Sequence, residues 1–142
     1  MSAGELPGTA ARPVLATPRL ARALAHYREV LGFELLQEIP GVLGFVRGAG
    51  ITLQLWQRPG PVQPVRCRVP LDGAPGAIFE SHARLARQSR GCVSQAPRLR
   101  PWGAWEFSLT DGDGHCITLA QWAAADARAP AGLPSRGLEG RP

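Results

Sequence analysis

The histidines are the first side chains in this sequence that a metal ion or a proton transfer would use. There are three, His26, His82 and His115, and none stands beside a carboxylate at the spacing of a metal site. His26 and His82 fall on predicted helices and His115 in a predicted turn, so we expect packing or surface roles. Cys116 follows His115 directly, but neighbours on a strand point to opposite faces, which argues against a nucleophilic pair.

The cysteines indicate a reducing compartment. Cys67, Cys92 and Cys116 stand singly in apolar stretches, and no CxxC spacing occurs. An odd number of separated thiols is typical of buried free cysteines in cytoplasmic proteins. The apolar runs are too short for a membrane span of roughly 20 residues, and the N-terminus has no signal pattern. We therefore expect a cytoplasmic protein with no membrane contact.

The net charge of the chain narrows the class of ligand that it can bind. The formal net charge is +5, and every basic residue is an arginine. The arginines are scattered along the chain, and no nucleic-acid motif accompanies them, so we do not expect a nucleic-acid partner. Like-signed fields weaken binding of a cationic ligand, so a neutral or anionic molecule fits this chain better.

Trp102 is the residue best suited to bind such a molecule. It lies between Pro101 and Gly103 in a predicted loop, where a core role is less natural than on a strand. An indole stacked on a planar ligand gains about 0.5–1.5 kcal/mol beyond the area it buries. The alternative is that Trp102 plugs a loop at a dimer interface. Arg98 and Arg100 flank this segment and contact either ligand or water.

Other candidate binding residues lie in the first half of the chain. Gln54 and Trp56 share one face of a predicted strand, which is either a cleft face or a solvent face. Phe33 and Phe45 complete an apolar wall or pack in the core. Arg47 offers a charge-assisted hydrogen bond to an anionic or carbonyl group, or else ends its strand in solvent.

The elements that position these residues form a repeated order. In the first half we predict a strand at 13–17, a helix at 18–31 with Thr17 as N-cap and Pro18 at its first position, and strands at 33–39, 42–47 and 51–57. Gly32 ends the helix. In the second half we predict a strand at 65–71, a helix at 77–89, a short strand at 92–95, a loop at 97–103, and strands at 104–109 and 115–122.

This order predicts an α+β fold of two βαβββ modules, at about 12–58 and 64–122, whose curved mixed sheets form a cleft. Residues 1–11 are expected to be a flexible N-terminal arm. Residues 123–142 contain almost no large apolar side chains, and we expect a disordered tail.

Two segments resemble a known superfamily. The first is the run Pro13-Val14-Leu15 together with the helix end Leu31-Gly32-Phe33. The second is the segment 101–115, which contains the sequences PWG, EF and DGDGH. They resemble the vicinal oxygen chelate superfamily, which includes glyoxalases, bleomycin-resistance proteins and dioxygenases. The second segment is similar to the bleomycin-resistance branch. The resemblance covers residues 12 to 122. It implies paired βαβββ modules, a homodimer whose N-terminal strand can swap between protomers, and ligand clefts walled by the sheets.

The resemblance also locates the positions at which the superfamily's enzymes hold a metal ion. They fall on Arg12, Gln54, Val65 and Thr118. Arginine stays protonated, valine has no donor atom, and the other two side chains are weak neutral donors. We therefore expect no metal, no cofactor and no catalytic residue.

The resulting hypothesis is a metal-free protein that binds a small planar antibiotic-like or toxin-like molecule and confers resistance by sequestration. The PWG tryptophan of the bleomycin-resistance branch stacks on the flat part of the drug, which implies that role for Trp102. The expected ligand-binding residues are Trp102, Gly103, Trp56, Gln54, Phe33, Phe45, Arg47 and Arg100. Two alternatives remain. One is an enzyme of the same fold, either a metal-dependent glyoxalase- or dioxygenase-type lyase or oxidoreductase, or a metal-free enzyme. The other is a structural or regulatory dimer with a vestigial cleft.

Overall fold

The computed structural model describes residues 13–123, apart from the side chain of Arg90. The predicted arm at 1–11, Arg12, and all but the first residue of the predicted tail at 123–142 lie outside the described residues.

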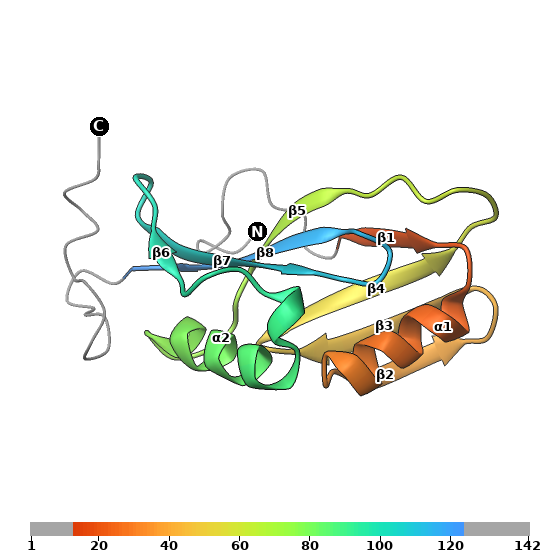
Figure 1. Cartoon of the computed structure of the whole chain (residues 1–142), viewed down its shortest axis with the longest axis horizontal. Coiled ribbons are helices and arrows are strands. Elements are labelled where there is room, and N and C mark those ends of the chain that lie inside the picture. Colours follow the sequence, from red (N-terminus) through yellow and green to blue (C-terminus); the bar gives the residue numbers. More distant parts are fainter. Residues whose placement is uncertain (1–12, 124–142) are drawn as a thin grey trace.

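Two modules of the same order follow each other along the chain (Figure 1). The first holds β1 (Val14–Thr17), α1 (Leu20–Ala25), the π-helical turn η1 (His26–Val30), β2 (Glu34–Ile39), β3 (Leu43–Gly48) and β4 (Ile51–Gln57). The second holds β5 (Arg66–Pro70), α2 (Ala77–Gln88), the 3-10 turn η2 (Arg90–Cys92), β6 (Arg98–Leu99), β7 (Ala104–Thr110) and β8 (Cys116–Trp122).

The two sheets have matching topologies. Their strand orders are β1-β4-β3-β2 and β5-β8-β7-β6. In each sheet the module's first strand pairs in parallel with its last, and the other pairings are antiparallel. The predicted α+β class with paired βαβββ modules and mixed sheets is therefore confirmed. Within this chain β1 pairs with β4 of its own module.

The first helix differs from its prediction at its start. It begins at Leu20 with Arg19 as N-cap, so the assignment of Thr17 as N-cap was wrong. Thr17 is instead the last residue of β1, from which its hydroxyl accepts a hydrogen bond from the Arg19 N–H at 3.3 Å. The helix widens into η1 and ends before Gly32, whose φ of +75° suits a residue without a Cβ.

The second module corrects the prediction for residues 92–95. That segment holds the end of η2 and a single bridge from Val93 to Leu109, not a strand. The edge strand is β6, which lies inside the predicted loop at 97–103 and pairs with β7. It forms because a tight turn at 100–103 folds the chain back on β7, and this edge hairpin carries Trp102.

One core joins the two modules. Each sheet turns one face of alternating apolar residues inward, as Ile51, Leu53 and Leu55 do on β4 and as Ile117 and Leu119 do on β8. Helix α1 covers β3 and β4, and α2 covers β7 and β8 (Figure 1). Because these faces are filled, the opposite face of each sheet is the one left for other contacts. We call it the open face of that sheet.

Buried polar bonds also tie the modules together. The His115 ring is completely buried, its Nδ1 accepts from the Val65 N–H at 3.1 Å, and its Nε2 therefore donates to the Ala16 carbonyl at 2.8 Å. The Tyr27 hydroxyl donates to Asp111 at 2.7 Å. His115 is thus a buried structural link between β1, β5 and the β7–β8 turn. No helix in the described part of the chain is long and apolar enough to cross a membrane.

Candidate functional site

The predicted binding residues fall into three places. Gln54, Trp56, Phe45 and Arg47 lie on the open face of the first sheet. Arg100, Trp102 and Gly103 lie in the turn between β6 and β7 on the second sheet. Phe33 is 4% exposed and packs edge-on against Tyr27 in the core, so the structure places it away from both open faces.

A tight turn presents Trp102 to solvent. The Arg100 carbonyl accepts the Gly103 N–H at 2.9 Å, and the Arg100 N–H donates to the Ala104 carbonyl at 2.8 Å. Pro101 presets the backbone of the turn, and Gly103 supplies a φ of +93°. Trp102 therefore sits at the tip of a hydrogen-bonded hairpin with 46% of its surface exposed.

A buried carboxylate anchors this indole. The Trp102 Nε1–H donates to Oε2 of Glu106 at 2.8 Å, and Nε of Arg68 donates to the same oxygen at 3.0 Å. The Glu106 side chain is only 8% exposed, and that of Arg68 is 33% exposed. A carboxylate this buried requires a partner charge, which Arg68 supplies. The indole is therefore held in one orientation by a neutralised acid.

Two arginines lie over the Trp102 ring. The guanidinium carbon of Arg68 is 5.3 Å from the ring centroid, and that of Arg100 is 5.0 Å from it. Both distances suit cation–π contacts. A flat ligand that stacks on Trp102 must therefore share the ring with these guanidinium groups or displace one of them.

A hollow of about 320 Å³ lies beside this cluster on the open face of the second sheet. Its lining residues are Ser94, Gln95, Ala96, Arg98, Arg100, Glu106, Phe107, Ser108 and Thr118. The Ser108 and Thr118 hydroxyls are hydrogen-bonded to each other at 3.1 Å. The hollow thus combines hydroxyl donors, two arginines and the anchored Glu106, and all of its lining comes from the second module.

The open face of the first sheet is bonded internally. The Trp56 Nε1–H donates to Oε1 of Gln54 at 2.9 Å, and Phe45 is the cross-strand neighbour of Gln54. Arg47 donates to the Thr52 hydroxyl at 2.7 Å and lies 3.5 Å from the Asp72 carboxylate. These side chains form a mostly neutral, half-buried surface with one ion-paired arginine at its end.

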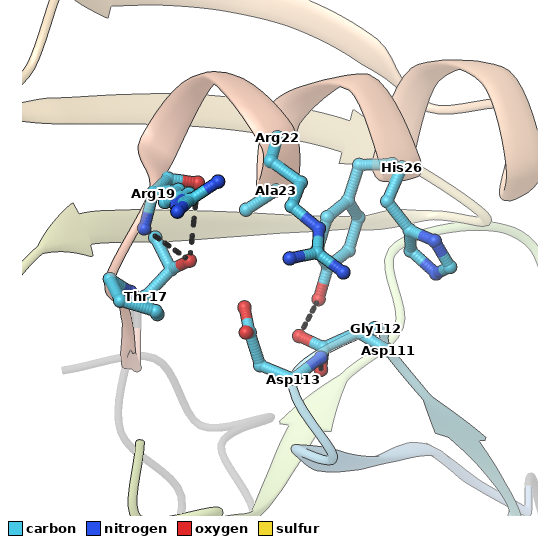
Figure 2. Close-up of a pocket in the computed structure, with 10 residues that line it drawn as sticks. Thr17, Arg19, Arg22, Ala23, His26, Asp111, Gly112 and Asp113 are labelled. Carbon is cyan, nitrogen blue, oxygen red and sulfur yellow. Dashed lines mark hydrogen bonds between the residues drawn. The ribbon is translucent and has the colours of Figure 1, made fainter. Parts of the chain in front are cut away.

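A second hollow, of about 260 Å³, lies between α1 and the β7–β8 turn (Figure 2). Arg22 points from the helix toward the turn, where Asp113 stands opposite it. Burial, together with the neighbouring Asp111 charge and hydrogen bond, raises the pKa of Tyr27 well above its ordinary value of 10.0. None of the predicted binding residues lines this hollow. Its acids are Asp111 and Asp113, and its bases are Arg19, Arg22 and His26.

Comparison with known proteins places the fold. No family model matches the chain, and no curated protein matches it in sequence. Solved structures do match. One is a bleomycin resistance determinant encoded on the transposon Tn5, at 22% identity with a TM-score of 0.60, covering 81% of this chain and 98% of that one.

Two further structures match at a similar level. A bleomycin-binding protein complexed with bleomycin is 22% identical, with a TM-score of 0.56 and coverage of 79% of this chain and 97% of that one. A lactoylglutathione lyase from Agrobacterium tumefaciens is 20% identical, with a TM-score of 0.55 and coverage of 82% and 96%. The chain has the vicinal oxygen chelate fold. Identities this low establish the fold alone, because one fold carries many functions.

The metal positions of the vicinal oxygen chelate enzymes do not suit a metal here. The resemblance implies that these positions are Arg12, Gln54, Val65 and Thr118. Of these, Gln54 lies on β4, Thr118 on β8 and Val65 just before β5. The β5 residue beside Thr118 on the open face is Arg68, which cannot donate a lone pair. In residues 13–123 no three histidine, cysteine, aspartate or glutamate side chains are placed so that they could hold a metal ion. The donors at these positions, within the part of the chain that the structure describes, therefore do not fit a divalent ion.

Two residues of the Trp102 cluster, Glu106 and Arg68, were not predicted as site residues from the sequence. Strand alternation does put Glu106 on the face opposite Trp105 and Phe107, which was a usable signal. Nothing local links Arg68 to Glu106, because the two are 38 residues apart and meet only when β5 and β7 flank β8.

Proposed function

We propose that this protein binds a small planar organic molecule on the open face of its second sheet, against Trp102, and acts by sequestering it. The observation that carries the proposal is the indole of Trp102, which is exposed at a tight turn and yet hydrogen-bonded to Glu106. An exposed aromatic ring held in one orientation is preorganised for stacking, because little side-chain entropy remains to be lost on binding.

The comparisons support binding without naming the ligand. The solved structures that match this chain include proteins described as a bleomycin-binding protein and a bleomycin resistance determinant. Bleomycin itself fits this chain poorly, because a protein with a net charge of +5 repels a cationic drug. The proposed role is resistance to an antibiotic-like or toxin-like molecule of neutral or negative charge.

A second copy of the chain completes the proposed site. The hollow beside Glu106 is walled by residues of the second module alone, which leaves its far side without a wall from the first sheet. The open face of the first sheet carries a neutral aromatic surface of suitable character, with Phe45, Gln54 and Trp56. We propose a cytoplasmic homodimer in which that surface of one copy faces the Trp102 cluster of the other.

Replacement of Trp102 tests the proposal. In a small-molecule screen read by tryptophan fluorescence, a bound ligand should quench the wild type. Its affinity, measured by isothermal titration calorimetry, should fall at least tenfold with Trp102→Ala. Trp102→Phe keeps a flat ring and should retain part of that affinity. Trp105→Phe removes an indole on the opposite face of β7, where Trp105 packs against Phe79, and serves as the spectroscopic control.

Two outcomes would contradict the proposal. One is a ligand that binds equally well to wild type and Trp102→Ala. The other is stoichiometric zinc, nickel, manganese or iron in protein purified without added metal, with the ion lost on Gln54→Leu, which would favour a metal-dependent enzyme. Sedimentation of the purified protein as a monomer at working concentration would overturn the dimer.

A further inference from the structure

Resting on the proposed function, we propose that the ligand is a planar organic anion, such as an aromatic carboxylate or sulfonate, and that Arg100 receives its acid group. The proposal names a chemical class for the site and one residue that selects it.

The open face of the second sheet is strongly basic. Arg66 and Arg68 on β5 and Arg98 and Arg100 on the edge hairpin share this face, because cross-strand register places Arg68 beside Thr118 and Arg98 beside Glu106. Among the described strand positions of this face Glu106 is the one acid. A ligand approaching here therefore meets an excess of positive charge.

The single acid is already neutralised. Glu106 accepts hydrogen bonds from Arg68 and from the Trp102 indole, both at Oε2. It therefore offsets Arg68 and leaves little negative charge for a cationic ligand. Within the described residues Arg98 and Arg100 form no ion pair, and both line the hollow. Two guanidinium groups are thus available to an anion.

Arg100 is the better placed of the arginines. Of the two that lie over Trp102, Arg68 is tethered to Glu106 at 3.0 Å, whereas Arg100 has no carboxylate partner in the described part of the chain. A ring that stacks on the indole therefore displaces Arg100 and leaves Arg68 in place. The displaced guanidinium remains at the rim of the hollow, where its planar fork can hold an acid group by two parallel hydrogen bonds.

A pair of fluorescent probes that differ only in charge tests this inference. Anilinonaphthalene sulfonate carries one negative charge, and N-phenylnaphthylamine has the same rings without the sulfonate. We expect the sulfonate to bind the wild type at least tenfold more tightly, and Arg100→Gln to abolish that preference while changing the affinity for the neutral probe less than twofold. Added salt should weaken only the sulfonate. Arg84→Gln, an exposed site on α2, is the matched control and should change neither affinity.

The outcomes separate this inference from the function on which it rests. Equal affinity for the two probes, both lost with Trp102→Ala, overturns the anion preference and leaves the Trp102 site intact. A sulfonate preference that survives Arg100→Gln and disappears with Arg98→Gln overturns the assignment to Arg100. Binding of either probe that is indifferent to Trp102→Ala, or absent altogether, overturns both. Unchanged thermal unfolding of each variant shows that the fold is kept.

Discussion

On the first sheet the open face carries Phe45, Gln54 and Trp56, whereas on the second it carries Arg68, Glu106 and Thr118. Both sheets have the same strand order, and both pack their other face into one shared core. The topology thus sets where an open face lies, and the side chains alone decide what it can bind. The indoles show the difference most directly, since Trp56 is bonded to a neutral amide and Trp102 to a buried carboxylate.

The shared core should give the largest and most similar effects in the two modules. Leu53 on β4 and Leu119 on β8 are both completely buried. We expect Leu53→Ala and Leu119→Ala each to lower the free energy of unfolding by about 2–5 kcal/mol, in a single cooperative transition seen by denaturant titration. Two separate transitions, one affected by each substitution, would show that the modules unfold independently.

The two open faces should differ in how much stability is lost when the hydrogen-bond acceptor of an indole is removed. Glu106→Ala removes the acceptor of Trp102 and leaves Arg68 without its carboxylate, so we expect a cost of about 1–2 kcal/mol, reduced by the partial exposure of Arg68. Gln54→Ala removes the acceptor of Trp56, a neutral hydrogen bond of about 0.5–1.5 kcal/mol. Chemical denaturation measures both costs. A cost for Gln54→Ala above that for Glu106→Ala would reverse the comparison.

The link between the modules should depend on pH. The buried Tyr27 hydroxyl donates to Asp111, and its pKa is raised above the unfolded value of 10.0. Its contribution is therefore complete below about pH 10 and is lost as the pH rises through the folded pKa. Tyr27→Phe should cost about 1 kcal/mol at neutral pH, and its difference from the wild type should shrink above pH 10.

Cys67 titrates in the same range, because burial raises the pKa of its thiol from 9.0 to about 11. The charge of an ionised Cys67 also raises the pKa of Tyr27, so Tyr27→Phe is compared with the wild type in a Cys67→Ser background. Unfolding measured from pH 7 to 11 checks the prediction. A difference that grows with pH would mean that Tyr27 is not the group responsible.

The smallest effect is expected at the end of the first sheet. Arg47 and Asp72 form an ion pair whose side chains are 42% and 73% exposed. Exposed pairs contribute about 0–1 kcal/mol, so Asp72→Asn should change stability by about 0.5 kcal/mol or less and should lose even that in high salt. A larger cost that persists in high salt would show that the ion pair on this open face stabilises the fold as much as the ion pair on the second open face.

Particular residues show how much of the fold can be predicted from short stretches of sequence. The alternation of Ile51, Leu53 and Leu55 predicted β4 with the bounds it has, and Gly32 marked the end of the first helix. The prediction for 92–95 was wrong because a short edge strand has almost no periodicity of its own and takes its pairing from β7. The roles of Trp102 and Arg100 as ligand contacts remain predictions, although both lie in the second-sheet cluster.

The sequence by itself determined the two βαβββ modules, the inward faces of their strands and the exposed turn that carries Trp102, because periodicity and turn chemistry act over a few residues. Only the tertiary structure decided that Arg68 neutralises Glu106, that Glu106 holds Trp102 and that His115 joins β1 to β5. The physical reason is that these bonds connect strands distant in the chain, so their partners are chosen by sheet order and register, which no local pattern encodes.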